Sequence, residues 1–121
     1  MTTLAAPALA LFLCITSVAH FAFPVYFRSL VPDWLPRPAA FVVGSALAEL
    51  ALAALLLEPS ARGVGGWSAA ALFTAFQTAH LDAVRHVRTR PGVLCSGWGV
   101  GARLLVNAVY VAWAVVVATA A

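Results

Sequence analysis

Four stretches of about 20 residues dominate this sequence, and each is almost free of charged side chains. A transmembrane α-helix needs about 20 consecutive, mainly apolar residues to cross the hydrocarbon layer of a bilayer. Hydrophobic residues fill 64% of the 121 positions and charged residues 9%, whereas soluble domains have about half and about a quarter. We therefore expect membrane-spanning helices at residues 4–23, 39–57, 67–84 and 102–121.

Four spans of about 20 residues use about 80 positions and leave about 41 for loops. We therefore expect one domain, residues 1–121, folded as an all-α, integral membrane four-helix bundle. Residues 24–38 contain four prolines and cannot form one continuous helix. Apolar side chains recur there at helical spacing, which predicts short helical pieces, broken near Pro32, that lie in the membrane interface and cap the bundle: Phe27, Leu30, Val31, Trp34 and Leu35. Residues 58–66 contain Pro59 and three glycines, which predicts a tight turn.

Arginine residues are unevenly divided among the connections, which predicts the orientation in the membrane. Only Arg62 lies in the second connection, whereas the first and third, with the start of the last stretch, hold Arg28, Arg37, Arg85, Arg88, Arg90 and Arg103. Arginine favours the cytoplasmic side, so we expect both termini outside, in the cytoplasmic membrane. Arg85, Arg88 and Arg90 have a second interpretation, contact with anionic lipid or a partner. The first stretch also resembles a signal peptide at Ser17-Val18-Ala19, but no positive charge precedes it.

Charge and cysteine content exclude several functions. The formal charge of +3 comes from seven arginines against four acids, with no concentrated basic face, so we expect no nucleic-acid partner. Cys14 and Cys95 form no C-x-x-C motif and are expected to be free thiols. No nucleophile set of the Ser-His-Asp or Cys-His type is discernible, and the sequence assigns no catalytic residue.

Glu49 lies near the middle of the second stretch and is the first candidate for a functional residue. A carboxyl group at this depth is costly unless it is protonated, paired or turned toward a cavity. Each stretch supplies polar side chains that could surround it: His20, Ser45, Gln77, His80, Asn107 and Tyr110. The competing interpretation is that these groups only hold helices together, at about 0.6 kcal/mol per contact, and we favour it for Thr16, Ser45 and Asn107.

Depth along the helices predicts a pocket. Each residue rises about 1.5 Å and successive helices alternate in direction, which places His20, His80 and Asn107 in the cytoplasmic half and Glu49 and Gln77 near the middle. We expect a polar pocket capped by the connector, with Glu49 as its floor. By the same count His20 and Glu49 differ in depth by roughly 10 Å, too far to share one ion, so no metal site is expected.

Several of these residues also carry a family resemblance. His20-Phe21, Pro24, Phe27 and the run from Val31 to Pro38 are similar to the signature that joins helices one and two in DoxX-like membrane proteins. The second stretch agrees, with Ser45, Glu49-Leu50, Leu55 to Pro59, Arg62 and Gly66-Trp67. The sequence departs from the family at Ala46, where glycine is usual, and at Phe76 to His80, where Phe-Pro-Ala-Asn is common.

The resemblance implies a compact four-helix bundle in the cytoplasmic membrane, in a family named for a quinol oxidase subunit and linked to thiol and sulfur redox systems. It implies a site at His20 and Glu49. Our first hypothesis is therefore an accessory subunit of a quinone- or thiol-linked redox system, acting with a membrane or cytoplasmic redox protein. Its pocket would hold a quinone-like headgroup or relay a proton through Glu49, with His20 or His80 as partner.

Two other hypotheses remain. The protein could be a non-enzymatic scaffold whose arginine loop and connector bind a partner. It could also be a small proton-coupled carrier with a path along His20, Glu49 and His80. The sequence names no ligand.

Overall fold

The structure, a computed structural model, describes residues 2–121 and consists of helices joined by short connections. Its α-helices are α1 (Thr2–Ala22), α2 (Pro24–Leu30), α3 (Pro38–Leu57), α4 (Arg62–Ala83) and α5 (Gly97–Ala120). Two 3-10 turns, Val84–His86 and Val93–Cys95, lie between α4 and α5. Residues 2–121 contain no β-strand, so the predicted all-α class is confirmed.

The predicted count of four helices is wrong, because the connector contains α2 as a fifth. Pro24 stands at the start of α2, where its missing N–H would have no partner in any case. Val31 ends the helix in an extended conformation, as the residue before a proline prefers. The predicted break near Pro32 is therefore where the helix stops.

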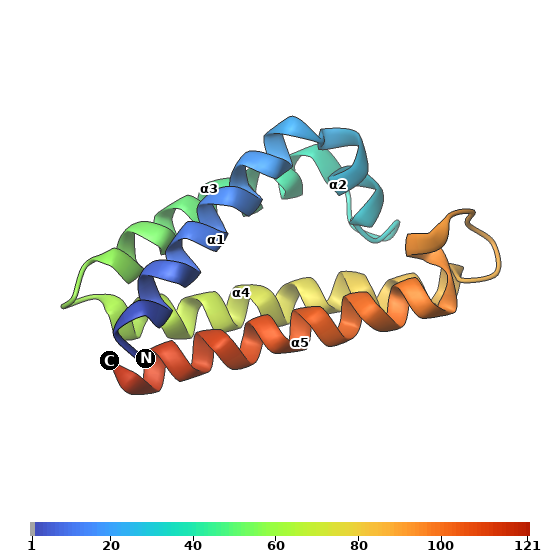
Figure 1. Cartoon of the computed structure of the whole chain (residues 1–121). Helices are drawn as coiled ribbons and strands as arrows, with labels where there is room; N and C mark the ends of the chain where they lie inside the picture. Colours follow the sequence, from blue (N-terminus) through green and yellow to red (C-terminus); the bar gives the residue numbers. More distant parts are fainter. Residues whose placement is uncertain (1) are drawn as a thin grey trace.

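The long helices form two antiparallel pairs, α1 with α3 and α4 with α5 (Figure 1). The pairs lie together at the end that holds both chain termini and the turn between α3 and α4. They separate toward the other end, where α2 and the rest of the connector extend from the first pair toward the second (Figure 1). The close end is filled by a core that includes Leu9, Leu13, Leu56 and Phe73.

Three of the long helices are long and apolar enough to cross a membrane: Thr3–Ala22, Pro38–Leu57 and Gly97–Ala120. Large apolar side chains such as Leu11, Ile15 and Leu47 point outward from them. An outer surface of this kind fits a membrane protein, as the composition predicts.

Helix α4 is equally long but less apolar, and its polar residues explain why. Gln77 and His80 are directed inward, toward α5 and toward the space between the pairs. The exposed residues of α4 are uncharged: Val64, Trp67, Ala71, Thr74, Ala75, Thr78 and Leu81. The fourth membrane span stays a prediction, and the distribution of polar groups on α4 is compatible with it.

The predicted turn at residues 58–66 is wrong over its second half, because α4 already begins at Arg62. Gly66 serves helix packing there. A Cβ atom at Gly66 would lie 2.7 Å from backbone atoms of Ala118, so only glycine lets α4 and α5 approach so closely. Helix α5 likewise begins before the predicted residue 102, because the Ser96 hydroxyl caps it by accepting the Gly99 N–H at 3.1 Å.

Candidate functional site

A pocket of about 500 Å³ lies between the two helix pairs, at the end where they separate. Ligand pockets commonly measure about 300–1,000 Å³ and combine apolar walls with a few polar groups. The walls here are largely aromatic and aliphatic, and they include Phe12, Phe41, Leu72, Phe73 and Phe76. The polar residues that line the pocket are Thr16, His20, Ser45, Glu49, Thr78, His80, Asn107 and Tyr110.

The connector forms the cap of this pocket. The apolar side chains singled out by their helical spacing in the sequence all line it: Phe27, Leu30, Val31, Trp34 and Leu35. Phe27 also stacks on the His20 imidazole, with ring centroids 4.0 Å apart and planes inclined by 23°. The cap thereby holds the His20 ring in place.

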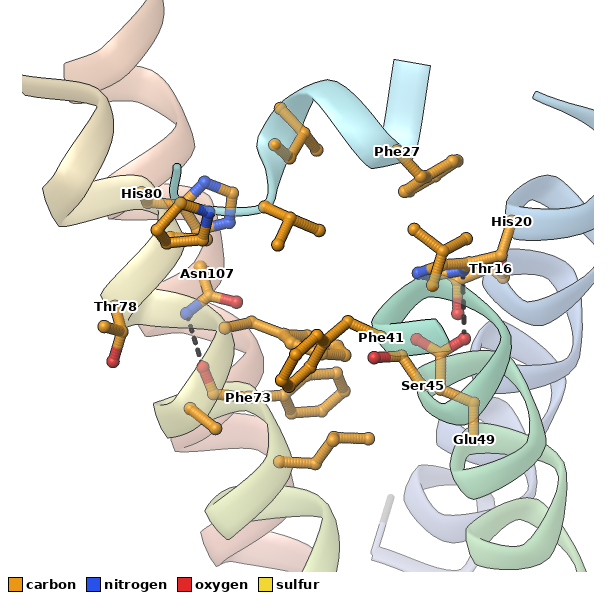
Figure 2. Close-up of a pocket in the computed structure, with 18 of the residues that line it drawn as sticks. Thr16, His20, Phe27, Phe41, Ser45, Glu49, Phe73, Thr78, His80 and Asn107 are labelled. Atoms are coloured by element: carbon orange, nitrogen blue, oxygen red, sulfur yellow. Dashed lines mark hydrogen bonds and ion pairs between the residues drawn. The ribbon is translucent and has the colours of Figure 1, made fainter. Parts of the chain in front are cut away.

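Glu49 is 1% exposed, and its carboxyl group lies beside His20 (Figure 2). The Glu49 Oε2 atom is 3.3 Å from His20 Nδ1. His20 Nδ1 is also 2.6 Å from the Thr16 carbonyl oxygen, which can only accept, so Nδ1 carries a hydrogen. That N–H is directed at Thr16, and Glu49 Oε2 has no hydrogen-bond partner among the described residues.

The contact between Glu49 and His20 corrects the sequence-based depth count, which set these residues roughly 10 Å apart. The count compared positions along the helix axes. Side chains lean toward the N-terminus of their own helix, and α1 and α3 are antiparallel, so His20 leans inward while Glu49 leans toward the cap. Distance is therefore no argument against a shared ion. The part of the chain that the structure describes contains no group of three potential metal ligands.

The opposite wall is built by amide groups of α4 and α5. Asn107 Nδ2 donates to the Phe73 carbonyl oxygen and to Gln77 Oε1, both at 2.8 Å. Gln77 Nε2 in turn donates to the Leu104 carbonyl oxygen at 3.2 Å. Gln77 does not line the pocket, and its contacts join the two helices. Asn107 does both.

His80 and Tyr110 complete this wall, and Ser45 lies across from them on α3, one turn before Glu49. Arg103 Nε donates to His80 Nδ1 at 3.2 Å, which leaves the His80 hydrogen on Nε2. The Tyr110 ring packs 4.5 Å from the Phe12 ring, measured between centroids. Thus Glu49, His20, Ser45, His80, Asn107 and Tyr110 share one pocket, but His80 and Glu49 are on opposite walls (Figure 2).

The contact of Arg103 with His80 was not predicted from the sequence, since Arg103 was counted only as a charge near a helix end. Its position one turn before Asn107 places both residues on one face of α5, and this spacing was the available signal.

The arginines of the third connection are mainly engaged within the protein. Arg85 pairs with Asp82 at 3.3 Å. Arg90 Nη2 donates to both carboxylate oxygens of Asp33 in the connector, at 3.0 and 3.2 Å. His86 Nε2 lies 3.8 Å from Asp33 Oδ2. Arg88 makes no ion pair with any residue that the structure describes.

The contacts of Asp33 with Arg90 and His86 connect the cap to the loop after α4. Asp33 and His86 could not be identified from the sequence, because their partners come from a distant part of the chain.

Comparison with known proteins adds a family but no activity. No curated protein and no solved structure matches the chain. A family model described as a domain of unknown function, DUF8561, matches residues 9–118, which is most of the chain. The chain therefore belongs to the DUF8561 family.

Proposed function

We propose that this protein is a multi-pass protein of the cytoplasmic membrane that binds the ring of a quinone-type molecule in the pocket, as an accessory subunit of a membrane redox system. The observation that carries this proposal is the buried Glu49 carboxyl group beside a pocket with largely apolar walls, whose Oε2 atom has no hydrogen-bond partner among the described residues. An unsatisfied buried acceptor costs about 1–3 kcal/mol. A bound donor would remove this cost.

The walls of the pocket favour a flat, amphipathic ligand. Phe12, Phe73 and Tyr110 offer ring faces and edges that pack well against another ring. Polar groups stand on both sides of this aromatic space, at Glu49 and at Asn107 (Figure 2). A quinone-type ring has this combination of an apolar face and oxygen atoms at opposite ends, and it is supplied by the lipid phase.

The redox setting rests on the resemblance to DoxX-like proteins, which includes His20, Glu49 and the connector. The geometry supports this resemblance in one respect, since His20 and Glu49, the two residues carried over from it, are in contact. The partner would be a membrane or cytoplasmic redox protein. In this proposal all four long helices cross the membrane and both termini lie outside.

The two alternative functions receive less support. A scaffold that binds its partner through arginines would need free guanidinium groups, but Arg85 and Arg90 are paired within the protein, which leaves only Arg88 of the three without an ion pair to the described residues. A carrier would need a path beyond the pocket, but the end of the molecule next to the termini is filled by the apolar core around Leu9, Leu13 and Leu56.

The test measures quinone bound to purified protein. The protein and a Glu49→Met variant are purified from membranes in mild detergent, and quinones are extracted and quantified per chain. Methionine has a similar length and no acceptor of comparable strength, so a hydroxyl group on the bound ring would lose its acceptor. The extracted quinone, oxidised and reduced forms counted together, should fall by at least about tenfold. Replacing a buried carboxyl group by an apolar one should leave the melting temperature unchanged or raise it.

Glu58→Gln is the matched control, because Glu58 is an exposed acid in the turn at the other end of the molecule. It should bind as much quinone as the unaltered protein. Equal quinone in the Glu49→Met variant, or no quinone in the unaltered protein, would contradict the proposal. A large fall in melting temperature for Glu49→Met would instead assign Glu49 to structural support.

A further inference from the structure

Arg28 of α2 is a charged residue whose partner does not lie within the protein. The chain contains four acids, and in residues 2–121 none of them pairs with Arg28. Asp33 and Asp82 contact basic side chains of the loop after α4. Glu49 is buried beside His20, and residue 58 lies in the turn at the other end of the molecule (Figure 1). The counter-charge of Arg28 is therefore left to the surroundings of the protein.

The Arg28 side chain is nevertheless oriented by the protein. Its Nε–H donates to the Pro24 carbonyl oxygen at 3.3 Å, four residues earlier, which lays the side chain back along α2. The N–H groups on its two Nη atoms have no hydrogen-bond partner in the described part of the chain. A planar guanidinium group with free N–H donors matches the oxygen atoms of a phosphate group. Because it is already oriented, it loses less side-chain freedom when it binds.

A second, smaller cavity of about 100 Å³ lies beside Arg28, where α1, α2 and α3 meet. Its lining residues are Arg28 and His20 together with the apolar residues Phe21, Pro24, Ala39, Val42 and Val43. Phe21 and Val43 are 53% and 44% exposed, so this cavity lies at the outer surface of the first helix pair. It shares only His20 and Val42 with the larger pocket between the pairs. The cavity is therefore a separate candidate site.

Charge and apolar surface follow one another here along the direction of the helices. Arg28 and Ala39 lie at the cap end, whereas Val42 is four residues after the start of α3, about 6 Å further along the helix axis. A phospholipid has the same order, with a phosphate group at the membrane surface and acyl chains below it. A free phosphate ion would use the arginine and leave the apolar walls without a contact.

We propose that Arg28 and the adjoining cavity bind one anionic phospholipid, with the phosphate group on the Arg28 guanidinium group and an acyl chain against Phe21 and Val43. A zwitterionic lipid carries its own cation beside the phosphate, so the unpaired charge of Arg28 favours a lipid with net negative charge. This inference rests on the membrane location in the proposed function and on none of its statements about the ring ligand.

The experiment compares two lipids with the same chains. Purified protein in mild detergent is incubated with equal amounts of dioleoyl phosphatidylglycerol and dioleoyl phosphatidylcholine, and the first bound lipid is identified by native mass spectrometry. Phosphatidylglycerol should exceed phosphatidylcholine by at least about fivefold, and Arg28→Gln should remove this preference. Arg88→Gln is the matched control, because Arg88 is also exposed and without an ion pair to the described residues but does not line the cavity.

Two further measurements test the acyl chain. Val43→Trp should lower bound phosphatidylglycerol by at least about fivefold, because the indole group would occupy the space of the chain. Leu47→Trp should have no effect, since Leu47 is exposed one turn further along α3 and does not line the cavity. Glycerol phosphate, a head group without chains, should not displace the lipid even in large excess.

Each opposite result overturns a stated part of the inference. Equal binding of the two lipids by the unaltered protein, or binding of neither, overturns the anionic-lipid site. The same preference in Arg28→Gln as in the unaltered protein, or an equal loss in Arg88→Gln, shows that Arg28 forms no defined site. Unchanged binding in Val43→Trp, or displacement by glycerol phosphate, removes the role of the acyl chain. None of these results bears on the extraction of quinone, which tests the proposed function separately.

Discussion

At the scale of single residues, Gly66 makes the sharpest prediction about stability. A Cβ atom there would meet backbone atoms of Ala118 at 2.7 Å, and backbone cannot move aside cheaply. Gly66→Ala should therefore lower the free energy of unfolding by about 1–3 kcal/mol. Thermal denaturation in detergent, followed by circular dichroism, measures the effect.

Gly101 supplies the control for Gly66, since it also lies in a helix but a Cβ atom there would meet nothing within 4 Å in the part of the chain that the structure describes. Gly101→Ala should change stability by no more than about 1 kcal/mol, in the stabilising direction. Equal melting temperatures for the two variants would show that α4 and α5 do not pack as closely as described.

A candidate functional residue could be predicted from the sequence when its side chain is unusual among its neighbours. Glu49 stands out because a carboxyl group is costly within an apolar stretch. Its contact with His20 was not predictable from a count of axial rise, since the direction in which both side chains lean decides it. The orientation of the Asn107 amide depends on the Phe73 backbone and could not be predicted from Asn107 itself.

At the scale of elements, the position of the cap depends on ion pairs between segments far apart in the chain. Arg90 and His86 of the loop after α4 both contact Asp33 of the connector. The Asp33 side chain is 72% exposed, and exposed pairs contribute about 0–1 kcal/mol. The contacts of Asp33 therefore contribute only weakly to holding the connector against the loop after α4, and we expect their loss to increase access to the pocket.

Labelling of a cysteine inside the pocket tests this dependence. Ser45→Cys is introduced after Cys14 and Cys95 are replaced, and its reaction with a small thiol reagent is timed. Ser45 lines the pocket beneath the cap. Arg90→Gln should accelerate labelling by up to about fivefold, the change that corresponds to 1 kcal/mol.

Two further variants make the labelling result specific. A double variant that exchanges the two charges, Asp33→Arg with Arg90→Asp, should restore the slow labelling rate of the background that has Arg90. Arg85→Gln breaks a pair between Arg85 and Asp82, which lie three residues apart, and should have no effect. Labelling at the same rate in Arg90→Gln and in the unaltered background would show that the ion pair does not control the cap.

The limits of a helix could be predicted from the sequence where one local property determines them. The prolines of the connector indicated where helices cannot continue, and α2 indeed stops before Pro32. The glycines at residues 63–66 were misleading, because the sequence signal for a turn is the same as that for close helix packing. Only the neighbouring backbone of Ala118 distinguishes the two.

At the scale of the whole molecule, the separation of the two helix pairs could not be predicted from the sequence. Apolar stretches of membrane-spanning length predict helices but not the angle between pairs. At the close end, Gly65 of α4 leaves little space beside Leu55 of α3, a contact that no pattern within either helix indicates. The distribution of charge was predictable. The connector and the loop after α4 lie at one end of the molecule and hold most arginines, while Arg62 lies at the other (Figure 1).

This charge distribution predicts how the protein sits in a membrane. The arginine-rich end should face the cytoplasm, with the turn between α3 and α4 and both termini outside. Two single-cysteine proteins test it, one retaining Cys95 in the loop before α5 and one with Ser60→Cys in the turn. Each is expressed in a bacterial host and exposed, in spheroplasts, to a maleimide that cannot cross membranes.

The cysteine at position 60 should react in intact spheroplasts, whereas Cys95 should react only after the membrane is permeabilised. The difference should exceed about tenfold, because a bilayer blocks a charged reagent almost completely. The reverse pattern would invert the orientation and place the connector that caps the pocket outside. Reaction of both cysteines in intact spheroplasts would put the two ends on one side of the membrane, and α4 would then not be a membrane span.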